Sequence, residues 1–107
     1  VRGGAWDDTI TGDGNANNVE ARGGNDSVAG GGGNDTILGE GGDDSLAGDD
    51  GNDNLNGADG NDTLVGGNGD DTMFGNLGDD SFVGGGGFDF AALQELSGTT
   101  GVYVDLG

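Results

Sequence analysis

The sequence predicts an all-β fold, a right-handed parallel β-roll built from nine-residue turn-and-strand units, two of which close one coil. Three observations predict it. The chain repeats with a period of nine over residues 3–92 without an insertion. Each unit joins a half rich in glycine and aspartate to a half centred on an apolar residue. The 107 residues include 29 glycines and no proline or cysteine, which excludes collagen and a disulfide scaffold. A fixed short period is typical of a solenoid, whose units pack on their neighbours.

Numbering the places of each unit from one to nine, with Gly3 in place one, gives ten units. The first six places hold mostly glycine, asparagine and aspartate, the residues of turns with positive φ. The seventh to ninth places predict a short strand with its middle residue pointing inward. The fourth place is glycine in the last eight units. The eighth place is a single apolar column: Ile10, Val19, Val28, Ile37, Leu46, Leu55, Leu64, Met73, Phe82 and Ala91.

Charge points to cations as partners. The chain carries 21 acidic and 2 basic residues, a net charge of −19, which opposes binding to nucleic acid or anionic membranes. No apolar run approaches the roughly 18 residues of a membrane span, and residues 1–6 lack the apolar stretch of a signal peptide. Without histidine, cysteine or an apolar pocket to tune a pKa, we expect no catalysis in this segment.

The sixth place holds aspartate in nine of the ten units, with Asn17 as the exception. Because unit n stacks on unit n+2, folding brings these carboxylates one strand spacing apart, and hydrophobic burial at one residue per unit cannot offset the conformational entropy. The two arginines cannot neutralise them. Carboxylate and carbonyl oxygens in flexible loops suit a hard cation, and calcium better than magnesium. The sequence therefore predicts calcium between stacked turns.

Units such as residues 66–74, Gly-Gly-Asn-Gly-Asp-Asp-Thr-Met-Phe, resemble the GGxGxDxUx nonapeptide of the RTX, or repeats-in-toxin, calcium-binding family. The resemblance covers residues 3–92 and implies a parallel β-roll with calcium held by sixth-place carboxylates and glycine-turn carbonyls of units n and n+2. It implies about six strong sites, pairing Asp26/Asp44, Asp44/Asp62, Asp62/Asp80, Asp35/Asp53, Asp53/Asp71 and Asp71/Asp89. The carbonyls belong to Gly24, Gly33, Gly42, Gly51, Gly60, Gly69 and Gly78.

The first two units depart from this pattern, because Trp6 and Asn15 replace the fourth-place glycine. Sites at Asp8 and Asn17, which would raise the number to eight, are therefore set apart from the six. Trp6 is expected instead to cover the N-terminal end of the core. Six divalent ions would reduce the net charge of −19 to −7.

Residues 93–107 follow the repeats as one domain with them. Val102, Val104 and Leu106 alternate as in a strand, and with Leu93 and Leu96 they are expected to form a partial C-terminal cap. The abrupt stop at Gly107 suggests a fragment of a larger protein.

The resemblance implies a non-catalytic, monomeric calcium-folded module of a secreted, extracellular bacterial protein exported by type I secretion, with other domains of the parent chain as partners. One alternative is similar to the substrate-supporting R-modules of alginate epimerases, which the net charge opposes. Adhesin and ice-binding rolls are further alternatives, although the third place lacks the threonine row expected of the latter.

Overall fold

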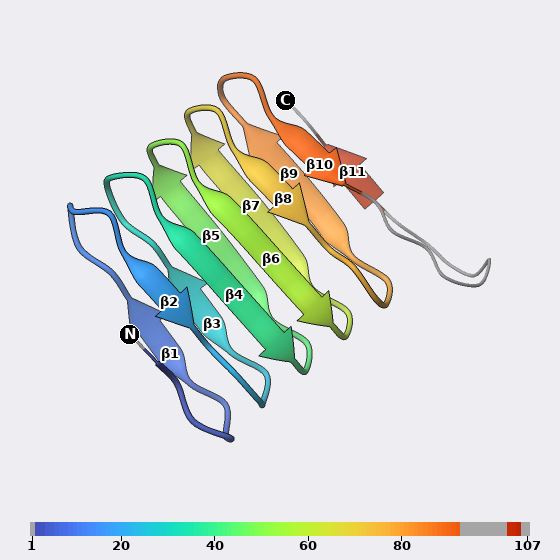
Figure 1. Cartoon of the computed structure of the whole chain (residues 1–107). Helices are drawn as coiled ribbons and strands as arrows, with labels where there is room; N and C mark the ends of the chain where they lie inside the picture. The colour runs from blue at the N-terminus through green and yellow to red at the C-terminus, as the bar shows by residue number, and fades with distance from the viewer. Residues whose placement is uncertain (1, 93–102, 106–107) are drawn as a thin grey trace.

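The computed structural model describes residues 2–92 and 103–105, and these form two parallel β-sheets packed face to face (Figure 1). No helix occurs in this part of the chain. The six-stranded sheet contains β1 (Thr9–Thr11), β3 (Ser27–Ala29), β5 (Ser45–Asp50), β7 (Thr63–Asn68), β9 (Ser81–Gly85) and β11 (Tyr103–Asp105). The five-stranded sheet contains β2 (Asn18–Glu20), β4 (Thr36–Gly41), β6 (Asn54–Asp59), β8 (Thr72–Phe74) and β10 (Phe90–Ala92).

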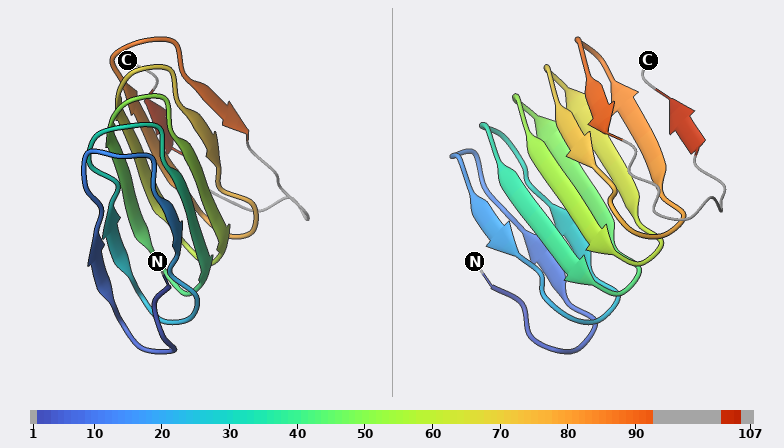
Figure 2. Two further views of the ribbon diagram at one scale, coloured as in Figure 1. Left: turned by 60° about the vertical axis from the view of Figure 1, so that its left-hand side comes forward. Right: turned by 45° about the vertical axis from the view of Figure 1, so that its right-hand side comes forward.

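Consecutive strands alternate between the two sheets, so each coil of the chain contributes one strand to each. Within a sheet every neighbouring pair is parallel and, from β1 to β10, in a register of 18 residues, as in Thr36 opposite Asn54 and Ser45 opposite Thr63. Figure 2 shows the successive turns stacked along both edges of the roll. The predicted β-solenoid with 18-residue coils is therefore confirmed.

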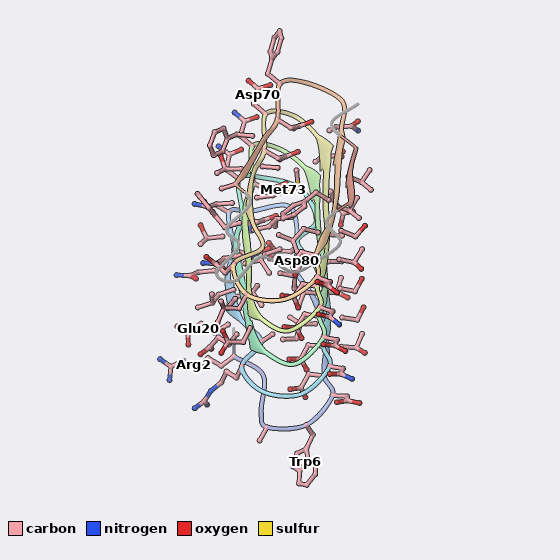
Figure 3. All side chains as sticks on the ribbon, turned by 90° about the vertical axis from the view of Figure 1, so that its right-hand side faces the viewer. Arg2, Trp6, Glu20, Asp70, Met73 and Asp80 are labelled. Atoms are coloured by element: carbon pink, nitrogen blue, oxygen red, sulfur yellow. The ribbon has the colours of Figure 1, made fainter. Side chains whose placement is uncertain are left out.

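The core is the apolar column of the eighth place. Val19, Val28 and the next six members of the column are buried, and Ile10 and Ala91 at its ends pack against them. Figure 3 shows Met73 between the two sheets. The seventh and ninth places point outward, as predicted, so each unit gives the core only one large side chain.

The four central strands are longer than the three predicted residues, since β4 to β7 each contain six. They continue into the following unit, whose first-place glycine points inward and is buried, as Gly48 does in β5. The composition of the glycine-rich half of each unit predicts a turn alone. Here its first residues extend the strand, and the inner face at this position has no room for a side chain.

At the N-terminal end of the roll, the side chain of Trp6 does not lie where the sequence predicts it. Its side chain is 83% exposed and points away from the first turn (Figure 3), so the prediction that it covers the core is wrong. Trp6 occupies the fourth place, at the tip of a turn, from which a side chain cannot reach the inward column. At the other end Phe74 and Phe90 meet edge to face on the outer surface, with ring centroids 6.4 Å apart.

A strand near the C-terminus was predicted, and β11 is that strand. It pairs with β9 in parallel, Val104 lying opposite Phe82, and is the sixth strand of that sheet. Its register with β9 is 22 residues, Tyr103 opposite Ser81, where other pairs have 18. Leu93 and Leu96 lie outside the described residues.

Candidate metal centre

The turns are built on glycines that no other residue could replace without strain. In the last eight units the fourth-place glycine has φ between 92° and 116°. A Cβ on Gly42 would overlap the carbonyl oxygen of Gly24, the equivalent glycine of the previous coil. The fourth-place carbonyls that the sequence predicts as calcium ligands therefore lie between stacked turns, where the backbone of one coil packs on that of the next. The second place also has positive φ but tolerates Glu40, Asp49 and Ala58, at φ of 70–77°.

The sixth-place aspartates form a buried row along each edge of the roll. Asp35, Asp62 and Asp71 are each 1% exposed. From Asp26 onward, one oxygen of each carboxylate accepts a hydrogen bond from the backbone of the previous coil, as Oδ1 of Asp53 does from the N–H of Asp35 at 2.8 Å. These bonds join the members of all six predicted pairs: Asp26–Asp44, Asp44–Asp62, Asp62–Asp80, Asp35–Asp53, Asp53–Asp71 and Asp71–Asp89.

The other carboxylate oxygen, Oδ2, is buried without a hydrogen-bond partner in seven of these residues: Asp26, Asp35, Asp44, Asp53, Asp62, Asp71 and Asp89. An unpaired buried carboxylate oxygen is costly, and seven in two stacked rows are too many to be incidental. A group that is not part of the protein has to satisfy them, and a cation would supply the opposite charge that two rows of stacked carboxylates require.

The first-place glycines form the space around these oxygens. A Cβ on Gly39 would lie 2.5 Å from Oδ2 of Asp44 and 3.0 Å from the carbonyl oxygen of Gly57. A Cβ on Gly66 would likewise meet Oδ2 of Asp71 and approach the carbonyl oxygen of Gly84 to 2.7 Å. A carboxylate oxygen of one coil and a carbonyl oxygen of the next thus flank the same space.

These glycines were not among the predicted site residues, which included only the fourth place. The sequence does contain a signal for them, because the first place is glycine in nine of the ten units and Ala21 in the other. They are Gly30, Gly39, Gly48, Gly57, Gly66, Gly75 and Gly84.

The first two units differ from the others, as expected. Oδ2 of Asp8 accepts the N–H of Gly4 at 2.6 Å, and Oδ1 of Asn17 accepts the N–H of Asp13 at 2.9 Å. These two side-chain oxygens therefore have a hydrogen-bond partner within their own turn. Asp8 and Asn17 differ in this from the aspartates whose Oδ2 is buried and unpaired.

Burial determines the electrostatics of the row. It raises the pKa of Asp44 to about 6 and that of Asp53 to about 6, although each accepts a backbone N–H that acts in the opposite direction. Burial raises the pKa of Asp62 to about 7, and the carboxylates of Asp80 and Asp44 add to it. Without a cation, the folded roll therefore favours protonated aspartates at its centre.

This shift predicts opposite pH dependences with and without calcium. Because the pKa is raised from 3.8 on folding, the metal-free roll gains stability that is fully present below about pH 4 and lost as pH rises through 6 to 7. We expect more β-structure at pH 4 than at pH 8 without added metal, and weaker calcium binding at pH 5 than at pH 8. Circular dichroism tests both; metal-free β-structure that increases with pH would contradict them.

The donor set consists of oxygen atoms alone. Among the described residues, no group of three or more acidic, histidine or cysteine side chains converges as a metal site. Each site therefore has to combine one or two carboxylates with backbone carbonyls. Hard cations with high coordination numbers, calcium above all, accept such sets, so these residues fit calcium.

A family model describing the RTX calcium-binding nonapeptide repeat matches this chain in four copies, over residues 1–28, 21–55, 29–64 and 56–91. The chain belongs to this repeat family. The RTX resemblance carried by the nonapeptides is thus confirmed, and calcium binding is what this family implies for the chain. No curated protein matches the sequence. In the described part of this RTX roll, no helix is long and apolar enough to cross a membrane.

Proposed function

We propose that this chain is a calcium-binding module that folds on binding several calcium ions. One observation carries the proposal, the two rows of buried Oδ2 atoms that lack any partner. Calcium would supply the positive charge that these oxygens require. The protein supplies the rest: Oδ1 of each aspartate is fixed by a backbone N–H, and the first-place glycine, which has no Cβ, leaves room for Oδ2.

The proposed ligands are the sixth-place carboxylates and backbone carbonyls of the glycine turns, giving about six sites and up to eight if Asp8 and Asn17 contribute. We place the module in a larger secreted protein, exported unfolded by type I secretion and folded outside the cell. Support comes from the family and from a net charge of −19, which opposes folding where calcium is scarce. Residues 93–107 are proposed as its partial C-terminal cap, and no catalytic role is proposed.

If calcium bridges successive coils, the stability lost on replacing an aspartate should depend on where that aspartate lies along the roll. Asp53 bonds to Asp35 on one side and Asp71 on the other, and so belongs to two sites. Asp89 is bonded to Asp71 at the end of its row and belongs to one. With calcium at ten times its Kd, each site contributes about 1.4 kcal/mol. Asp53→Ala should therefore cost about 3 kcal/mol and Asp89→Ala about half of that.

Urea unfolding at fixed calcium measures these losses, and isothermal titration calorimetry counts the ions bound. We expect about two ions fewer for Asp53→Ala and about one fewer for Asp89→Ala. Equal losses for the two variants would show that calcium does not bridge successive coils.

A further inference from the structure

A second row of side chains runs along each edge, outside the aspartates of the sixth place. It consists of exposed fifth-place residues, and each asparagine or aspartate before the last coil accepts the backbone N–H of the fifth-place residue one coil later. Oδ1 of Asn25 accepts the N–H of Asp43, and Oδ1 of Asp43 accepts that of Asn61, both at 2.9 Å. We call the two rows the outer ladders: Asp7, Asn25, Asp43, Asn61 and Asp79 on one edge, and Asn34, Asn52, Asp70 and Phe88 on the other.

The hydrogen bonds of the outer ladders point in the opposite direction to those of the inner rows, which are the rows of sixth-place aspartates. In an outer ladder the later coil donates and the earlier coil accepts, as from Asp79 to Asn61. In an inner row the earlier coil donates, as from Asp62 to Asp80. Each turn is therefore tied to its neighbours through two adjacent residues with opposite polarity. The outer bonds are complete without a metal, whereas the inner rows leave Oδ2 unsatisfied.

Asparagine and aspartate both accept in the ladder at 2.9 Å, so the hydrogen bond itself does not decide between them. On the longer ladder they alternate strictly, and on neither ladder do two aspartates occupy successive coils. Carboxylates on successive coils would be about 4.8 Å apart, but alternate coils separate them by about 10 Å. The second distance exceeds the Debye length of about 8 Å at physiological ionic strength, and the first does not.

We propose that the outer ladders are positioning elements that hold the turns in register, and that their asparagines keep the ladder carboxylates apart because no bound cation neutralises this row. The proposal rests on the calcium-dependent fold. It assigns Asn61 in particular the role of a neutral spacer between Asp43 and Asp79.

The test is a pair of isosteric substitutions that each add one negative charge. Asn61→Asp places a carboxylate between two others, whereas Asn34→Asp places one next to Ala16 and Asn52, which are uncharged. In saturating calcium, urea unfolding should show the ratio of folded to unfolded chain reduced about tenfold by Asn61→Asp and less than about twofold by Asn34→Asp. At about 1 M salt the difference should largely vanish.

Adding Asp43→Asn and Asp79→Asn to the Asn61→Asp chain leaves its new carboxylate between two amides and should restore folding, including where the single variant does not fold. Equal effects of Asn61→Asp and Asn34→Asp, or no rescue, would overturn the spacer role. Tighter calcium binding by both would overturn it too, because the fifth place would then be a calcium ligand. If the unsubstituted chain gains no structure in calcium, the calcium-dependent fold itself is wrong.

Discussion

Addition of calcium to the metal-free chain at pH 7.5 or so should convert it from a disordered coil to the β-roll. Among the described residues, the inner rows hold seven buried carboxylate oxygens without a partner, and only nine apolar residues form the buried core. Six sites at ten times the Kd contribute about 8 kcal/mol, as much as the stability of an ordinary domain. Because most of the aspartates serve two sites, the transition should be cooperative.

Circular dichroism against calcium concentration measures this transition. A midpoint of about 0.1–1 mM, the range of extracellular calcium modules, would fit folding after export. Magnesium at the same concentration is the control, and it should have little effect because it demands a small, regular octahedron. A full β-spectrum in excess chelator at this pH would contradict the proposed role of calcium.

Replacement of a first-place glycine in the middle of the roll should destabilise it about as much as the loss of two calcium sites. A Cβ on Gly57 would overlap Oδ2 of Asp62 and lie 2.8 Å from its Cγ. The aspartate would have to leave the position in which it faces the next coil. We expect Gly57→Ala to cost about 3 kcal/mol or more and to raise the calcium midpoint.

Gly41→Ala is the matched control. Gly41 lies in the third place of its unit, near the end of β4, and a Cβ there meets nothing within 4 Å. The same substitution in the same type of segment should therefore leave the calcium midpoint almost unchanged. If urea unfolding in calcium shows similar losses for both variants, the space beside Asp62 is not part of a binding site.

The repeat could be predicted because one strict period governs every level of this fold. The apolar eighth place fixes which face of each strand is inside, and the positive φ of the fourth place follows from its glycines. The same period places Asp44 beside Asp26 and Asp62. A single coil therefore determines the next, and the pairs of aspartates follow from arithmetic.

The features that were missed break the period or depend on contacts within the interior. Trp6 occurs once, so no pattern shows which way it points, and its position at a turn tip keeps it out of the core. The close contact between Gly57 and the Asp62 carboxylate depends on where that carboxylate points, which the sequence does not show. The direction of the outer ladder at Asn61 likewise depends on which backbone N–H its oxygen reaches.

The most direct measurement of the central claim is a crystal structure of the chain grown with calcium. The account predicts ions between successive turns on both edges, each in contact with Oδ2 of a sixth-place aspartate such as Asp44, Asp53 or Asp62. It also predicts that the fifth-place row, including Asp43, carries none. Calcium bound only to the exposed aspartates, with the Oδ2 atoms still buried and unpaired, would contradict it.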